Sequence, residues 1–337
     1  MSRTPRLVAA AAIAVGVQFV GAASPGDIVE REVYLMGTRA RLATVAADRE
    51  TGLARLEQLL VPLEAGERRL STWRADSEIS QLNSSVPGRP FALSDETCTL
   101  LAVLERCVHD SGGAFDPVVG ALTAVWDLHG TGRVPSEAEL ERARDATGFQ
   151  ALGFAPATCT ATRRPGASVD VGAFGKGAAL DDAAAIADRG AAWLVDLGGQ
   201  VAARGAPAGM TGWPVAIAHP LHRDQPVVDL SLLDESIATS GRSERDLWSA
   251  GRRIGHILDP WTGRPAPFLG SVTVRHASAL IADVLSTALF VMGPDAGVPW
   301  ADARGIAALY LVPGPAGALQ HIATQAFREP RGGRPPP

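Results

Sequence analysis

Cysteine is scarce in this 337-residue sequence, which contains three cysteines and no cysteine motif for zinc. Cys98, Cys107 and Cys159 are odd in number, and their spacing matches no zinc motif. Cys98 and Cys107 could pair in an oxidising compartment, but one thiol would then be left over. The sequence favours the alternative, in which all three are isolated small residues of the core.

The chain also lacks charge blocks, internal repeats and any low-complexity middle segment. Its 31 Lys and Arg against 36 Asp and Glu give a net charge of −5 without a basic stripe, so no nucleic-acid partner is expected. Hydrophobic residues make up 46% and charged residues 20%, as in soluble globular proteins. The length suffices for one large domain or two small ones.

The N-terminal segment has the pattern of an export signal. Arg3 and Arg6 precede an almost uncharged apolar run, residues 7–20, and the small residues 21–23 follow it. The run is shorter than the roughly 20 residues that span a bilayer. We therefore expect residues 1–23 to be a cleaved signal peptide and the mature protein to be soluble in the periplasm. A retained membrane anchor is the alternative, and no cysteine follows the run for lipid attachment.

Hydrophobic spacing and cap residues predict the secondary structure. Apolar residues about 3.6 apart, with Ser94 and the Ser136–Glu139 pair as caps, predict helices at residues 49–63, 95–109, 136–147, 175–189 and 279–292. Short apolar runs predict strands at 33–45 (a pair, or one strand bent at Gly37), 193–197, 213–218, 227–232, 236–239, 272–274 and 307–312. The elements do not alternate regularly, so we expect an α+β fold. One domain is expected over residues 24–327, and the Pro/Gly/Arg-rich tail 328–337 is expected to be disordered.

A large aromatic side chain stands in a polar segment, residues 71–83. In a loop, the Trp73 ring could stack on a flat ring such as isoalloxazine or adenine. In the alternative interpretation, Asp76 or Ser77 caps a short helix and Trp73 is a partly exposed core residue.

Two glycines open a second segment, residues 112–120. Gly112 and Gly113 let the backbone approach a ligand closely. Asp116 precedes Pro117 and is therefore held in an extended conformation. The alternative is an ordinary loop that leads into a helix.

Three glycines within six residues precede the predicted helix at 175–189. Such a turn presents backbone N–H groups and a helix N-terminus to an anion, and Lys176 adds a positive charge for a phosphate. Its carbonyl groups could also bind a hard cation. The spacing is too short for a P-loop. The alternative is a tight strand-to-helix connection with a solvated lysine.

Ionisable residues occur in a turn-rich stretch, residues 255–265, which follows the segment 239–242. His256 could position a group or relay a proton, and Asp259 lies in the same stretch. In the alternative interpretation residues 260–263 form a hairpin turn and His256 is structural.

A carboxylate lies on the apolar helix predicted at 279–292. Asp283 and Thr287 are four residues apart and so share one face of this helix. A carboxylate there is costly unless it is paired or bound to metal. Carboxylate and hydroxyl oxygens suit Mg²⁺ that is shared with substrate phosphates. The alternative is that Asp283 accepts hydrogen bonds from a nearby loop.

Together and in this order, these segments resemble the FAD:protein FMN transferases, also called the thiamine-biosynthesis lipoprotein (ApbE) family. The resemblance covers nearly the whole chain after residue 35. It rests on Met36-Gly37-Thr38, 71–83, Gly113-Ala114-Phe115-Asp116-Pro117, 170–177, Asp196-Leu197-Gly198-Gly199, Thr239-Ser240-Gly241, 256–265 and 283–287. It implies a T-fold-like domain with largely antiparallel sheets.

The resemblance also implies a reaction. A Thr or Ser hydroxyl of an acceptor protein, often a membrane redox subunit, attacks the FMN phosphorus of FAD, and AMP leaves with the help of Mg²⁺. The implied metal ligands are the Ala173 carbonyl, Asp283 and Thr287. The implied FAD contacts are Met36, Trp73, Ala114, Phe115, Asp116, Asp170 and Lys176. Asp283, His256 and Asp259 remain candidates for the base.

Some positions depart from the family pattern. Trp73 replaces a common Tyr, Val118 a common Thr, Arg242-Ser243 an Asp-Tyr pair, and Trp261 a basic residue. None of these changes removes an implied metal ligand. Two other functions stay open: an FAD pyrophosphatase that uses water as acceptor, and a flavin-binding export protein without activity.

Overall fold

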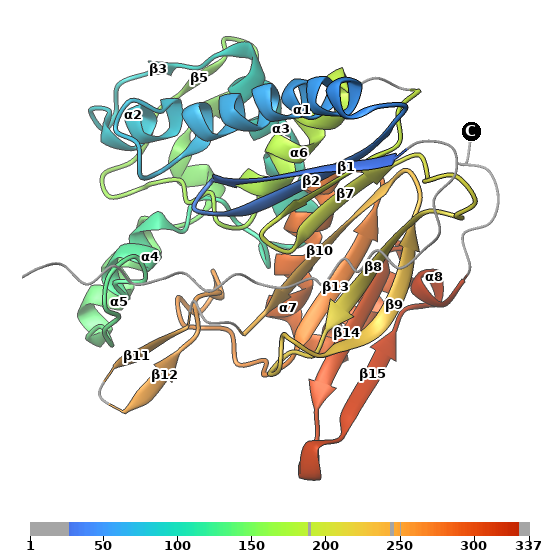
Figure 1. Cartoon of the computed structure of the whole chain (residues 1–337). Coiled ribbons are helices and arrows are strands. Elements are labelled where there is room, and N and C mark those ends of the chain that lie inside the picture. The colour runs from blue at the N-terminus through green and yellow to red at the C-terminus, as the bar shows by residue number, and fades with distance from the viewer. Residues whose placement is uncertain (1–26, 188–189, 243–245, 250, 330–337) are drawn as a thin grey trace, which may run out of the picture.

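The computed structural model describes residues 27–187, 190–242, 246–249 and 251–329. The predicted signal peptide lies outside these ranges, as do residues 330–337 of the predicted tail. An eight-stranded sheet runs through the molecule in the order β1-β2-β6-β7-β10-β13-β14-β15, and every neighbouring pair is antiparallel (Figure 1). The strands are β1 Asp27–Leu35, β2 Thr38–Ala46, β6 Trp193–Leu197, β7 Gln200–Arg204, β10 Glu235–Gly241, β13 Ser271–His276, β14 Ala307–Pro313 and β15 Leu319–Ala323.

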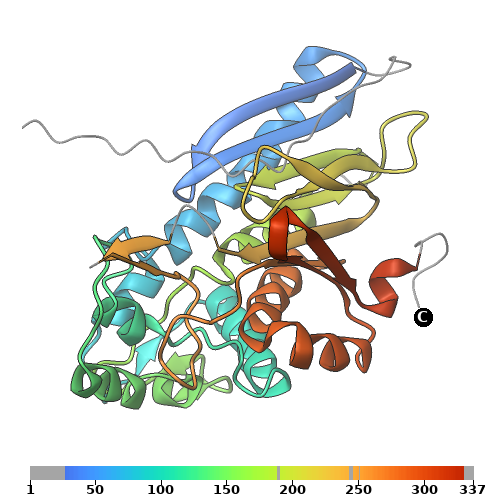
Figure 2. The ribbon, with the colours of Figure 1, turned by 90° about the horizontal axis from the view of Figure 1, so that it is seen from below.

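Each face of the sheet has its own cover (Figure 2). Helices α1 (Arg49–Leu70), α6 (Gly175–Ile186) and α7 (Ala279–Asp302) pack on one face, and the hairpin β8 (Trp213–Ala218)–β9 (Pro226–Leu232) packs on the other. Strand β6 shows how the sequence divides between the faces. Trp193 and Val195 join the core under the helices, whereas Leu194 joins Trp213 under the hairpin. This alternation follows from the two-residue period of a strand.

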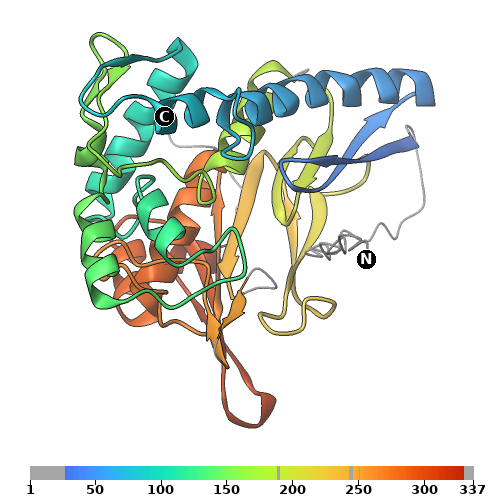
Figure 3. The same ribbon diagram turned by 90° about the vertical axis from the view of Figure 1, so that its left-hand side faces the viewer.

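Smaller elements surround this centre. Helices α2 (Glu78–Ser84), α3 (Asp95–Asp110), α4 (Gly120–Val125) and α5 (Glu137–Asp145) lie between α1 and α6 in the sequence, with a small sheet of β3 (Phe91–Ala92), β5 (Thr160–Ala161) and β4 (Phe154–Ala155). The two-stranded sheet β11 (Leu247–Ser249)–β12 (Arg252–Ile254) stands apart from the large one (Figure 1). The β14–β15 hairpin projects from the body (Figure 3). The last element of the described residues is α8 (Gln325–Arg328), which includes the first residue of the predicted tail.

The predicted α+β class is confirmed, and the local signals were accurate. Ser94 caps α3, and Ser136 and Glu139 form the predicted capping box of α5. Residues 33–45 belong to a strand pair and not to a single bent strand. Helix α1 runs seven residues beyond the predicted end because the apolar face continues to Leu70.

Helix α7 also departs from its prediction. Gly293 has a φ of 69° and ends the regular helix, as Gly293 and Pro294 predicted, but a second helical stretch continues to Asp302. By length and composition α7 could cross a membrane, yet half of its most apolar 18-residue window is buried inside the fold. Its contacts with α6, β10 and β13 make it a core helix of this domain.

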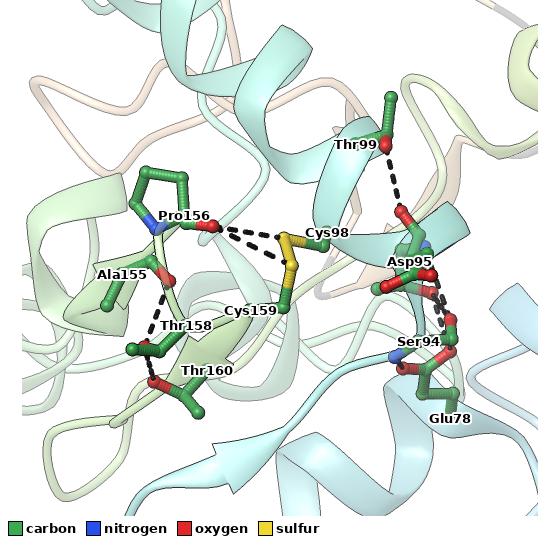
Figure 4. The surroundings of a disulfide bond; sticks show 11 residues. Glu78, Ser94, Asp95, Cys98, Thr99, Ala155, Pro156, Thr158, Cys159 and Thr160 are labelled. Atoms are coloured by element: carbon green, nitrogen blue, oxygen red, sulfur yellow. Dashed lines mark hydrogen bonds between the residues drawn. A yellow bond between two sulfur atoms is a disulfide. The ribbon is translucent and has the colours of Figure 1, made fainter.

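The expectations for the cysteines were wrong. Cys98 at the start of α3 forms a disulfide with Cys159 between β4 and β5 (Figure 4). Cys107 is the free cysteine of the described chain. The Cα atoms of the bonded pair are 5.4 Å apart, although 61 positions separate them in the sequence. Cys98 and Cys107 lie nine residues apart on one helix and therefore face different surroundings.

Candidate active site

A cavity of about 890 Å³ collects residues from segments far apart in the sequence. Its wall includes the β1–β2 turn, the loop after α1, the start of α6, the first turns of α7 and the end of β10. Ten of the eleven predicted site residues line it: Met36, Trp73, Ala114, Asp116, Asp170, Ala173, Lys176, His256, Asp283 and Thr287. Phe115 does not line the cavity, and its ring is buried in the core under the helices.

The carboxylate of Asp283 is held where α6 and α7 meet. Only 6% of this residue is exposed, and its Oδ2 accepts the backbone N–H of Gly177 at 3.1 Å. One turn further along α7, Thr287 Oγ1 lies 3.4 Å from the hydroxyl of Ser240 on β10. Burial on an apolar helix requires such partners. The alternative interpretation gave Asp283 a partner in a loop, whereas its partner in the structure is the first turn of α6, at the wall of the cavity.

The turn before α6 is fixed by Asp170. Its Oδ1 accepts the N–H of Gly172 at 2.8 Å, and its Oδ2 accepts the Thr123 hydroxyl at 3.0 Å. His129 Nε2 lies 3.7 Å from the same Oδ2. These contacts hold the turn so that Ala173 and Lys176 reach the cavity wall. Thr123 and His129 also line the cavity, and the sequence analysis missed both of them.

The three glycines of this turn, Gly172, Gly175 and Gly177, have different structural roles. A Cβ on Gly177 would lie 2.6 Å from the carbonyl oxygen of Ala279, so this glycine lets α6 and α7 approach each other. Gly172 and Gly175 do line the cavity, and a Cβ on Gly175 would lie 3.3 Å from Val171 Cβ. The expectation that the glycines admit a ligand therefore applies to two of them and not to Gly177.

An aromatic surface forms one side of the cavity. Trp73 is 73% exposed, which rules out the core interpretation, and its ring centroid lies 4.8 Å from that of His129. Ser77 caps α2, as the sequence suggested. An exposed indole beside an imidazole offers a face on which a planar ring system can stack.

The Ala114–Asp116 segment supports the cavity wall. Asp116 Oδ1 accepts the N–H of Val118 at 2.7 Å, and Oδ2 accepts the N–H of Phe149 at 2.9 Å. Burial raises the pKa of Asp116, and these two hydrogen bonds oppose the rise. Both oxygens thus brace the backbone, which gives Asp116 a structural task beside its place at the cavity.

The structure distinguishes between His256 and Asp259 as candidates for the catalytic base. His256 lines the cavity and its Nδ1 lies 2.8 Å from Asp246 Oδ1. Asp259 does not line it: its carboxylate accepts the N–H of Trp261 at 2.8 Å and the hydroxyl of Thr262 at 2.9 Å. Asp259 therefore shapes the turn that the alternative interpretation placed at residues 260–263.

The donor set fits magnesium that is bound together with a phosphate-containing substrate. In the described ranges, no group of three or more His, Cys, Asp or Glu side chains could hold a metal ion by itself. The cavity instead offers one carboxylate from Asp283, one hydroxyl from Thr287 and the main chain at Ala173. Mg²⁺ usually takes one or two carboxylates and completes its shell with water and substrate oxygens.

Known structures identify the class to which this fold and cavity belong. The ApbE protein of Thermotoga maritima is similar with a TM-score of 0.81 and 30% identity, over 90% of this chain and 98% of that one. The flavin transferase ApbE of Vibrio cholerae gives a TM-score of 0.77 at 31% identity, over 90% and 99%. The fold is that of the flavin transferases.

The sequence comparison places the chain within this class. Residues 36–310 match the model of the ApbE family. The FAD:protein FMN transferase of Vibrio cholerae is 32% identical over 303 residues, which cover 87% of this chain and 90% of the relative. That of Escherichia coli K12 is 30% identical over 281 residues, 80% of each chain. The chain belongs to the ApbE family, and the family and enzyme class predicted from its motifs are confirmed.

Proposed function

We propose that this protein transfers FMN from FAD to a Thr or Ser hydroxyl of an acceptor protein, in a magnesium-dependent reaction that releases AMP. One observation carries the proposal. A single cavity joins an exposed aromatic surface, a lysine at a helix N-terminus, and a buried carboxylate with a hydroxyl one turn away. The first suits a flavin or adenine ring, and the other two suit a pyrophosphate and its metal.

Each group then has a defined task. Trp73 stacks on a ring of FAD, and Lys176 with the start of α6 binds phosphate oxygens. Asp283, Thr287 and the Ala173 carbonyl would hold magnesium. When bound, magnesium neutralises charge on the pyrophosphate and aligns the attacking and leaving oxygens.

His256 is the base in this proposal. Asp283 accepts the N–H of Gly177 and would also hold the metal, and Asp259 does not line the cavity. The acceptor oxygen forms a bond to the FMN phosphorus while its proton passes to His256. The bond from that phosphorus to the bridging oxygen breaks, and AMP leaves with that oxygen.

We also propose that the reaction takes place outside the cytoplasm, on a membrane redox subunit. The Cys98–Cys159 disulfide supports export, because such bonds persist in oxidising compartments. Mass spectrometry of the exported protein tests the cleavage near Ser24. Recovery of residues 1–20 on that protein would contradict it.

The central test incubates the purified protein with FAD, Mg²⁺ and a respiratory redox subunit as acceptor. We expect a fluorescent flavin on the acceptor after denaturing electrophoresis, and one AMP released for each flavin attached. Without Mg²⁺ we expect neither the labelled acceptor nor AMP. FMN and AMP without a labelled protein would identify a hydrolase instead. Bound but intact FAD would identify a flavin-binding protein.

A matched pair of variants tests the metal site. Asp283→Asn keeps the shape of the side chain and removes its charge, so turnover should fall by orders of magnitude with the fold intact. Asp295→Asn alters an exposed residue of the same helix, away from the cavity, and should leave turnover unchanged. Equal turnover of the two variants would show that Asp283 is not a ligand of the metal.

A further inference from the structure

We propose that Asp246 is a positioning residue for the transfer reaction, which fixes the imidazole of His256 so that Nε2 receives the proton of the acceptor hydroxyl. The inference rests on the proposed function. None of the motifs in the sequence pointed to Asp246, and it does not line the cavity itself.

The geometry is that of a clamp. The side chain of Asp246 is 1% exposed, and its Oδ1 lies 2.8 Å from His256 Nδ1 and 3.2 Å from the backbone nitrogen of His256. Its Oδ2 lies 3.0 Å from Nε of Arg253. One carboxylate therefore holds both the ring and the main chain of His256, and Nε2 is the ring nitrogen left for the substrate.

The hairpin β11–β12 builds this clamp. Leu247 pairs with Ile254, which brings Asp246 and Gly255 to the same end of the hairpin. His256 follows directly and enters the cavity wall. The hydrogen bond between the His256 ring and the Asp246 carboxylate thus joins the two chain segments at one end of the β11–β12 sheet. This small sheet is separate from the large sheet.

The charge of Asp246 suits the task. Burial would raise the pKa of this carboxyl, but the hydrogen bonds and charge of His256 and the charge of Arg253 lower it below its usual value. An ionised carboxylate that accepts a hydrogen bond from Nδ1–H favours the tautomer of neutral His256 with its proton on Nδ1. The lone pair of Nε2 is then available to accept a proton. The carboxylate also stabilises the imidazolium that forms when the acceptor proton arrives, as the O–P bond forms and AMP leaves.

The test compares variants at saturating FAD with the acceptor subunit. Asp246→Asn should lower kcat about 10²- to 10⁴-fold while FAD binding, followed by fluorescence titration, stays within threefold. His256→Gln should lower kcat to a similar level, and the double variant should be no slower than His256→Gln alone. Arg253→Gln, which spares the bond between ring and carboxylate, should cost less than tenfold.

Two results would overturn the proposal: near-normal kcat in Asp246→Asn, or losses that add in the double variant. If Asp246→Asn does not fold, nitrogen-15 NMR of the histidines in the parent protein decides the matter. Neutral His256 should carry its proton on Nδ1, and a proton on Nε2 would contradict the role. A parent enzyme that labels no acceptor and releases no AMP would instead refute the proposed function.

Discussion

Gly177 donates its backbone N–H to Oδ2 of Asp283 across 3.1 Å, and this bond ties the first turn of α6 to the second turn of α7. The two helices also approach each other closely at this glycine, because a Cβ there would lie 2.6 Å from the Ala279 oxygen and 2.7 Å from Leu280 Cα. The position of the proposed metal ligand therefore depends on the packing of two helices.

Gly177→Ala and Gly175→Ala should differ sharply in stability. Both glycines lie in the first turn of α6, so both gain less than the roughly 1 kcal/mol of helix propensity that applies in a helix interior. The new methyl group at 177 meets backbone that cannot yield, and overpacking of this kind costs about 1–3 kcal/mol. At 175 the nearest atoms are side-chain carbons 3.3 Å or more away. Urea unfolding followed by tryptophan fluorescence measures the difference, and equal stability of the two variants would contradict this account of the packing.

The sequence was most informative where the physics is local. The Ser94 cap and the Ser136–Glu139 box depend on residues three positions apart, so each can be recognised in a single window. Asp283, Trp73 and Lys176 could be predicted because their chemistry marked them: a carboxylate on an apolar helix, a tryptophan in a polar loop and a lysine among glycines. Met36, Ala114 and Ala173 carry no such mark and were predicted only from the resemblance to the family.

Interactions that depend on tertiary structure were not accessible in this way. The Cys98–Cys159 bond spans 61 positions and forms only because the β4–β5 hairpin lies against α3. Glu67 accepts the N–H of Met36 at 3.0 Å, and no sequence pattern joins the end of α1 to the β1–β2 turn. The Asp246–His256 pair was not predicted because β11 and β12 are only three residues long and show no hydrophobic alternation that would indicate strands.

Trp73→Ala should weaken FAD binding without loss of stability. The side chain is 73% exposed, so its removal costs little folding energy, whereas a lost stacking partner raises Kd about tenfold. Trp73→Tyr should stay within about threefold. Trp248→Ala is the matched control, because Trp248 is 69% exposed and lies outside the cavity lining. Isothermal titration with FAD checks all three, and an unchanged Kd in Trp73→Ala would remove this ring from the site.

Loss of the disulfide should destabilise the protein and spare its chemistry. Closure of a 61-residue loop contributes about 2–4 kcal/mol, so Cys98→Ser should unfold at lower urea concentration. Neither cysteine lines the cavity, so FMN transfer at 25 °C should persist. Burial raises the pKa of the Cys107 thiol to about 11, which makes this cysteine unreactive, and Cys107→Ser serves as the control. Equal urea midpoints for Cys98→Ser and Cys107→Ser would show that the bond adds nothing.

The pH dependence of stability should reveal the carboxyl group of Asp196 on β6. Burial raises its pKa to about 6, while the N–H of Gly199 and the charges of Lys176 and Arg41 oppose the rise. The folded protein thus holds this proton more tightly than the unfolded chain does. Stability should therefore fall as pH rises from about 4 to 6, and the full penalty, about 1–3 kcal/mol, remains above pH 6.

Asp196→Asn removes this penalty, because a neutral amide is cheaper to bury and its oxygen can still accept the Gly199 N–H that now lies 2.7 Å from Oδ1. Other carboxyl groups titrate in the same range, so the quantity to measure is the difference between parent and variant in urea unfolding at pH 4 and pH 7.5. The two proteins should be nearly equal at pH 4, and the variant should be the more stable at pH 7.5. Asp229→Asn, at an exposed position of β9, should show no such difference. A parent protein that gains stability over the variant between pH 4 and pH 7.5 would mean that the charges of Lys176 and Arg41 outweigh the cost of burial.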